Sequence, residues 1–124
     1  MSDHVLFFGW QTPPLTENQR WSHWSRKAEV VRDVRATTRL WGRSLRDSGR
    51  VEVTLTWVVA DRRRRDADNI IPTLKALCDG LVDAGVVKDD TPEFMVKHMP
   101  IIEYRKGAVP HMILTVSVLN ANLD

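Results

Sequence analysis

Residues 51–85 have the sequence VEVTLTWVVADRRRRDADNIIPTLKALCDGLVDAG, and this stretch decides the fold. Its first nine residues alternate apolar with polar side chains, which is the period of a strand buried on one face. Residues 70–83 repeat apolar side chains every three or four positions instead, which predicts an amphipathic helix that Gly85 ends. A charged connector, residues 60–65, lies between the strand and the helix.

Further elements are predicted on both sides of this stretch by the same two periodicities. The predicted elements are strands over residues 4–8, 51–59, 95–104 and 111–119, and helices over residues 25–46 and 70–83. The last two strands are expected to form a hairpin through Lys106 and Gly107. The order β-α-β-α-β-β predicts one small α+β domain over residues 1–124, a mixed β-sheet covered by two main helices.

The composition is that of an ordinary globular domain, with 43% hydrophobic and 27% charged residues. No apolar run approaches the roughly 18 residues of a membrane helix, and the first ten residues lack the basic segment of a signal peptide. We therefore expect a cytoplasmic protein with no membrane partner. The single cysteine, Cys78, has Leu74 and Leu81 as helix-face neighbours, which predicts a packed thiol.

The charge is divided unevenly along the chain. Residues 1–65 carry 13 Lys and Arg against 7 Asp and Glu, whereas residues 66–124 carry 5 against 9, so the two parts have net charges of +6 and −4. A basic part can bind a polyanion, and an acidic part can hold cations against it. This combination fits nucleic-acid chemistry.

The densest charge lies in DRRRRDADN, residues 61–69. Four adjacent arginines repel one another, and a polyanionic partner is the economical reason for them, so we expect DNA contacts from Arg62, Arg63 and Arg64. Asp66 and Asp68 are two residues apart in an extended segment and can point to the same side. Paired carboxylates suit magnesium, which adds water and phosphate oxygens to one or two of them.

Two alternatives for this motif bear on the metal prediction. Asp68 or Asn69 could be a helix N-cap only, because Asp and Asn are the best capping residues. The pair Asp89 and Asp90 favours the metal site, since the chain turns back after Gly85 and can bring Asp90 toward Asp66. Calcium-loop, zinc and serine-hydrolase sites are excluded, because the spacing of glycines, cysteine and histidines does not suit them.

This region resembles the RusA family of Holliday-junction resolvases, the crossover junction endodeoxyribonucleases. The matching residues are Arg62, Arg63, Arg64, Arg65, Asp66, Asp68, Asn69, Lys75, Asp79, Leu81, Gly85, Asp89 and Asp90, with Pro13, Pro14 and Asn18 in the first loop. The resemblance implies a homodimeric endonuclease that nicks two opposed strands of a four-way DNA junction with magnesium, for which manganese can substitute. It also suits a nucleoid-associated recombination and repair enzyme of phage or prophage origin.

Carried over by position, the resemblance implies roles for individual side chains. The implied metal ligands are Asp66, Asp68 and Asp90, with Asp89 beside them. Lys75 and Arg65 match basic residues near the scissile phosphate, where they would neutralise charge in the transition state. Lys75 lies three residues farther from Asn69 than in the family's pattern, yet seven positions after Asp68 it stays on the same helix face.

Three further features bear on this interpretation. Asp79 could be a fourth metal ligand, but we expect it to pair with Lys75 at i,i+4. The first helix carries a basic stripe within an arc of about 80°, which predicts contact with the DNA backbone. The stripe consists of Arg32, Arg35, Arg39, Arg43 and Arg46. Residues 10–24 mix tryptophans with basic residues and could contact a strand end, pack over the sheet or contact a dimer partner.

Rival functions remain open on the sequence alone. One is a non-catalytic DNA-binding or architectural protein that keeps the basic surface and binds no metal. Another is a magnesium nuclease that acts on other branched DNA. A nucleotide hydrolase is disfavoured, because the six glycines form no phosphate-binding loop.

Overall fold

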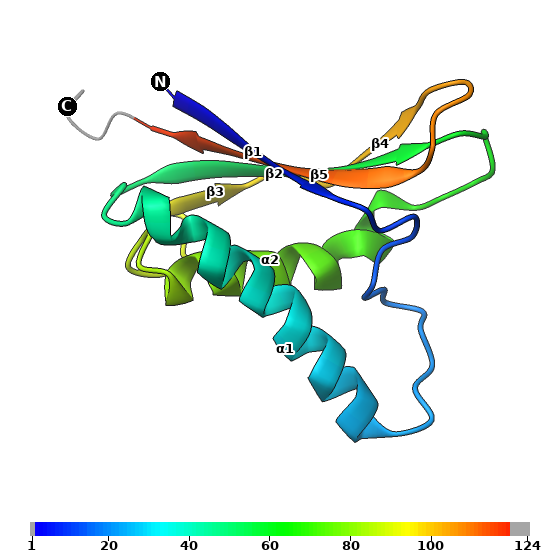
Figure 1. Ribbon diagram of the computed structural model, residues 1–124, viewed down its shortest axis with the longest axis horizontal. Coiled ribbons are helices and arrows are strands. Elements are labelled where there is room, and N and C mark those ends of the chain that lie inside the picture. Colours follow the sequence, from blue (N-terminus) through cyan, green and yellow to red (C-terminus); the bar gives the residue numbers. More distant parts are fainter. Residues whose placement is uncertain (1, 120–124) are drawn as a thin grey trace.

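The computed structural model describes residues 2–119 and confirms a single α+β domain with a mixed sheet and two main helices (Figure 1). The strands are β1 (Ser2–Phe8), β2 (Val51–Val59), β3 (Met95–Lys97), β4 (Ile101–Tyr104) and β5 (His111–Val118). The helices are α1 (Trp24–Trp41) and α2 (Ile71–Asp83), with short 3-10 turns η1 (Gly42–Leu45) and η2 (Ala67–Ile70).

The sheet is built around β2 and β5. Its order is β1-β5-β2-β3, and β4 pairs with the second half of β2 beyond β3. The pairs β1/β5 and β2/β5 are antiparallel, whereas β3 and β4 both run parallel to β2. Both helices lie against one face of this sheet, and no helix of residues 2–119 covers the other face (Figure 1). The fold therefore has two layers.

The expected strand over residues 95–104 and its hairpin with residues 111–119 were wrong. Residues 98–100 separate β3 from β4, and Pro100 has no N–H to offer a ladder. β4 and β5 are not paired, because β2 lies between them and bonds to both. The turn at Gly107, with φ of +77°, leads the chain across the end of β2 rather than into a hairpin.

The two helices are in close contact. Thr38 of α1 is fully buried and its hydroxyl donates to the carbonyl oxygen of Leu77 in α2 at 2.7 Å. A Cβ on Gly80 would lie 2.0 Å from Thr38 Oγ1 and 2.2 Å from the carbonyl oxygen of Arg35, so only glycine permits this approach. The first helix ends at Trp41, earlier than expected, because the chain tightens into η1.

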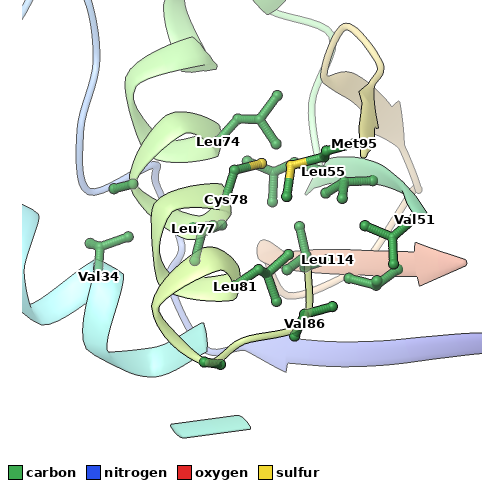
Figure 2. Packing of buried hydrophobic residues seen from close by; sticks show 14 of the residues in the cluster. Val34, Val51, Leu55, Leu74, Leu77, Cys78, Leu81, Val86, Met95 and Leu114 are labelled. Atoms are coloured by element: carbon green, nitrogen blue, oxygen red, sulfur yellow. The ribbon is translucent and has the colours of Figure 1, made fainter. Parts of the chain in front are cut away.

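The core lies between α2 and the inner faces of β2 and β5 (Figure 2). Cys78 is fully buried there beside Met95 and Leu55, which confirms the packed thiol. Burial raises the pKa of this thiol to about 12. None of the helices in residues 2–119 has the length and apolarity needed to cross a bilayer.

Candidate nucleic-acid and metal site

The first loop, residues 9–23 between β1 and α1, is hydrogen-bonded to the start of α2. The backbone N–H of Leu15 donates to Thr73 Oγ1 at 3.1 Å, and the Thr73 hydroxyl donates back to the Leu15 carbonyl at 2.7 Å. Two residues on, the N–H of Glu17 donates to the Asn69 carbonyl oxygen at 3.1 Å, and the N–H of Asn18 donates to Asn69 Oδ1 at 3.2 Å. These bonds hold the loop beside the DADN motif. Sequence reasoning missed Thr73, because a threonine in a helix gives no signal of a long-range partner.

The arginine run is folded around Asp61. Arg65 NH2 lies 2.8 Å from Asp61 Oδ1, and Arg65 NH1 donates to the carbonyl oxygens of Asp61 and Arg63 at 3.1 and 3.2 Å. The Arg65 guanidinium also lies over the indole ring of Trp57, 5.0 Å from its centroid. Hydrogen bonds from the Arg63 backbone N–H and from Arg65 hold the pKa of Asp61 below its usual value. Arg65 is therefore engaged within the chain.

The other arginines of the run are more exposed. Arg62 lies over the Tyr104 ring at 4.4 Å, which joins the connector to the end of β4. Arg63 has a long contact of 3.5 Å with Asp61. Arg64 is exposed and forms no ion pair within residues 2–119. Its guanidinium is therefore available to an added phosphate.

Asp66 and Asp68 are exposed and form no ion pair within the described part of the chain. Asp66 has extended backbone angles and precedes η2, and Asp68 lies inside η2. No side-chain capping bond is made at the start of η2 or of α2, and Asn69 Oδ1 accepts from the first loop instead. The helix-cap alternative was therefore wrong, and the two carboxylates are free to bind a ligand.

A hollow of about 430 Å³ opens between the first loop and the arginine run. Its polar lining includes Asn18, Gln19, Arg64, Asp66 and Asn69, and Trp57 and Ile70 supply apolar surface. Trp57 lies in the second half of β2. It is half-buried, and its indole N–H donates to the Gln11 carbonyl at 3.0 Å. The hollow places Asp66 beside amide and guanidinium groups from two separate segments.

A second charged cluster joins α2 to the end of β3. Lys75 Nζ is 3.6 Å from Asp79 Oδ1 and 3.9 Å from Asp90 Oδ2, so the predicted pair of Lys75 with Asp79 is confirmed. Lys97, at the end of β3, lies 3.5 Å from the same Asp90 oxygen. Burial alone would raise the pKa of Asp90, but the charges of Lys97 and Lys75 together lower it. Asp89 Oδ1 accepts the backbone N–H of Asp90 at 2.8 Å.

The four aspartates do not form one compact ligand group. No three His, Cys, Asp or Glu side chains in residues 2–119 are grouped closely enough to hold a single metal ion. Magnesium, however, takes only one or two carboxylates and completes its shell with water and phosphate oxygens. The unpaired carboxylates of Asp66 and Asp68 fit this ion in number and type, whereas the Asp90 carboxylate faces two lysines.

The arginine stripe lines two adjoining hollows of about 670 and 530 Å³ along the helices. The first contains Arg32, Arg35 and Arg39, and the second contains Arg39, Arg43 and Arg46. Asp83 of α2 lines both hollows and pairs with Arg35 through two hydrogen bonds, which lower the pKa of its carboxyl group. The stripe therefore meets an acidic residue from α2, which the spacing along α1 alone could not predict.

The tryptophans of residues 10–24 have different environments. Trp10 stacks on Phe8 with ring centroids 4.1 Å apart, and Trp21 packs partly against the core. Trp24 is 82% exposed at the start of α1 and lines the larger hollow of the arginine stripe. Packing thus accounts for Trp10 and Trp21.

Comparison of the sequence with protein-family models and with curated proteins finds no match.

Proposed function

We propose that this chain is a magnesium-dependent endonuclease that resolves four-way DNA junctions, as the resemblance to the RusA family implies. The observation that carries the proposal concerns Asp66 and Asp68, which directly follow a run of four arginines. Their carboxylates are exposed and form no ion pair within residues 2–119. Phosphodiester cleavage needs negative groups that bind a metal and positive groups that bind the phosphate, and this segment supplies both.

The chain's own residues divide the chemistry between them. Asp66 and Asp68 would hold magnesium, or manganese in its place, and Asp90 with its neighbour Asp89 would join them only by giving up the contacts of Asp90 with Lys75 and Lys97. When bound, the ion neutralises phosphate charge and activates water. Arg64 binds a phosphate oxygen through its free guanidinium. Lys75 lies one turn into α2 beside Asp90, where its ammonium group adds positive charge near the cleaved strand.

We also propose that the protein acts as a homodimer. A four-way junction has two-fold symmetry, so a symmetric dimer presents two equivalent sites for two symmetric nicks. Such an enzyme acts in the cytoplasm at the nucleoid, in recombination and repair of host, prophage or phage DNA.

The test uses a labelled four-way junction and a linear duplex with the same arms, each with magnesium or with EDTA. We expect paired symmetric nicks in the four-way junction but not in the duplex. The nicks should form with magnesium but not with EDTA. Asp68→Asn should lower the cleavage rate by at least about 100-fold, because it removes one of two metal-binding carboxylates. Asp3→Asn is the matched control, since Asp3 is an exposed aspartate on β1.

Three results would contradict the proposal. An intact junction that is bound in magnesium indicates the architectural protein. Equal cleavage of flaps and junctions indicates a nuclease for other branched DNA. Single unpaired nicks contradict the dimer.

A further inference from the structure

Trp24, the first residue of α1, has the most exposed large hydrophobic side chain in residues 2–119, at 82%. The tryptophans before it are packed instead, since Trp10 stacks on Phe8 and Trp21 packs partly against the core. An indole ring in water forgoes the free energy that burial of its large apolar surface supplies. An aromatic ring that the fold leaves uncovered is therefore a candidate contact for a ligand.

The surroundings of Trp24 form a hollow along one side of α1. Its volume is about 670 Å³, within the usual range for a site that binds a small molecule or a nucleotide. Ala28 and Val31 line it together with Trp24, at the spacing of four and three residues that places side chains on one helix face. The start of α1 projects away from the sheet (Figure 1). The hollow thus combines an aromatic ring with an apolar wall.

The charged lining of the hollow is mainly cationic. It consists of Lys27, Arg32, Arg35, Arg39 and one carboxylate, Asp83. Arg35 engages Asp83 through two hydrogen bonds. Lys27, Arg32 and Arg39 are exposed and form no ion pair within residues 2–119. Three unpaired cations beside an indole ring match a ligand that has both a planar ring and phosphate groups.

A nucleic-acid strand with unpaired bases has this combination of groups. In a duplex the face of each base is covered by its stacked neighbours, so arginines on a helix reach the phosphates but an indole ring finds no free base face. An unpaired base exposes its face and can stack on tryptophan while arginines bind the backbone. A protein partner fits less well, because charged residues are depleted in the centres of protein interfaces.

We propose that the hollow along α1 binds an unpaired nucleotide of a single strand. The base stacks on the indole ring of Trp24, and Arg32 and Arg39 bind the adjoining phosphates. Arg39 also lines the second hollow of the arginine stripe, so the backbone of the strand continues toward Arg43. None of the residues that line the larger hollow belongs to the proposed cleavage site, so this binding site goes beyond the proposed function and does not depend on it.

The test measures the affinity for labelled oligonucleotides in EDTA. The three ligands are a single strand of thymidines, a strand of the same length that is abasic at every position, and a duplex of that length. Wild type should bind the thymidine strand at least about tenfold more tightly than the abasic strand, as expected when one base stacks on an aromatic side chain. Trp24→Ala should weaken binding of the thymidine strand about tenfold and leave the other two affinities nearly unchanged. Trp24→Phe should keep most of the affinity, because it keeps an aromatic ring.

Phe7→Ala is the matched control. It removes another exposed aromatic ring, 68% exposed on β1 and outside the hollow. This variant should bind all three ligands like wild type. Arg32→Gln, in contrast, should weaken binding of the thymidine and abasic strands by the same factor, because both strands keep their phosphates.

Three results would overturn the inference. One is equal affinity of wild type for the thymidine and abasic strands, since no base would then stack. Another is an effect of Trp24→Ala that is absent or equal for all three ligands. The third is conversion of a dimer into monomers by Trp24→Ala in analytical ultracentrifugation, which would assign the hollow to an interface between two copies of the chain. The nuclease proposal is tested separately, by junction cleavage in magnesium.

Discussion

Arg64 and Arg65 are neighbours in the chain with opposite surroundings. The Arg65 side chain is 17% exposed, and its guanidinium is bonded to Asp61 and Arg63 and packed over Trp57. Arg64 is exposed and forms no ion pair within residues 2–119, although both side chains line the hollow beside Asp66. A guanidinium whose donors are engaged cannot bind phosphate without breaking those bonds. The contacts thus favour a structural role for Arg65 and phosphate binding by Arg64, whereas the RusA-like motif alone assigns the phosphate to Arg65.

Alanine variants separate the two roles. Arg64→Ala should lower single-turnover cleavage by about 10- to 100-fold, the usual effect of losing a hydrogen bond to a charged group, and leave Tm unchanged. Arg65→Ala should lower Tm by about 5 °C, because Asp61 and the connector lose their partner. Calorimetry and cleavage assays on both variants measure this. If Arg65→Ala keeps the wild-type Tm and abolishes cleavage, Arg65 is the phosphate ligand after all.

The site residues differ in how far sequence could predict them. The pair Lys75 and Asp79 follows from helical spacing alone, and the structure confirms it at 3.6 Å. Lys97 reaches Asp90 only because β3 pairs in parallel with β2, Val53 opposite Lys97. A register between distant strands has no local signature. Sequence could therefore predict pairs within one helix, but not the lysine that completes the cluster.

Between the elements, Gly80 sets the distance from α1 to α2. In an exposed helix, Gly→Ala stabilises by about 1 kcal/mol, because alanine has the better helix propensity. Here the added methyl group would meet Thr38 Oγ1 and the Arg35 carbonyl oxygen well inside contact distance. Gly80→Ala should therefore destabilise the protein by about 1–3 kcal/mol in urea unfolding.

Two further variants check the cause. Gly9→Ala has open space around the new methyl group and should leave stability nearly unchanged. Adding Thr38→Ala to Gly80→Ala should not restore stability, since the Arg35 carbonyl oxygen still blocks the methyl group at 2.2 Å. Wild-type stability in Gly80→Ala would mean that the helices can separate freely.

Among the strands, one sequence prediction is confirmed and another is wrong. Alternation over residues 51–59 gives the bounds of β2, because one buried face imposes a period of two. The Lys106–Gly107 turn predicts that the last two strands pair with each other, which is wrong. β2 bonds to β5 on one side and to β4 on the other, and the choice between these partners depends on burial of the whole sheet.

Across the whole molecule, the two-layer fold separates the two basic surfaces. The arginine run and the first loop meet at the start of α2, and the arginine stripe follows α1 toward the other end of α2, where Asp83 lies. Asp83 engages Arg35, so the net charge of the stripe is smaller than its five arginines suggest. The other four arginines of the stripe can neutralise phosphates and so release counterions from DNA.

Charge reversal of the stripe tests whether it carries DNA. Arg39 and Arg43 line the hollows and form no ion pair within residues 2–119. Arg39→Glu with Arg43→Glu should weaken junction binding and make the slope of log K against log salt shallower by about 2, one unit for each phosphate that the stripe no longer neutralises. Arg26→Glu with Arg50→Glu, a double reversal outside the stripe, carries the same net charge and should keep the wild-type slope. Binding is measured in EDTA so that cleavage does not interfere, and a slope that changes equally in both double variants would show that the stripe acts only through total charge.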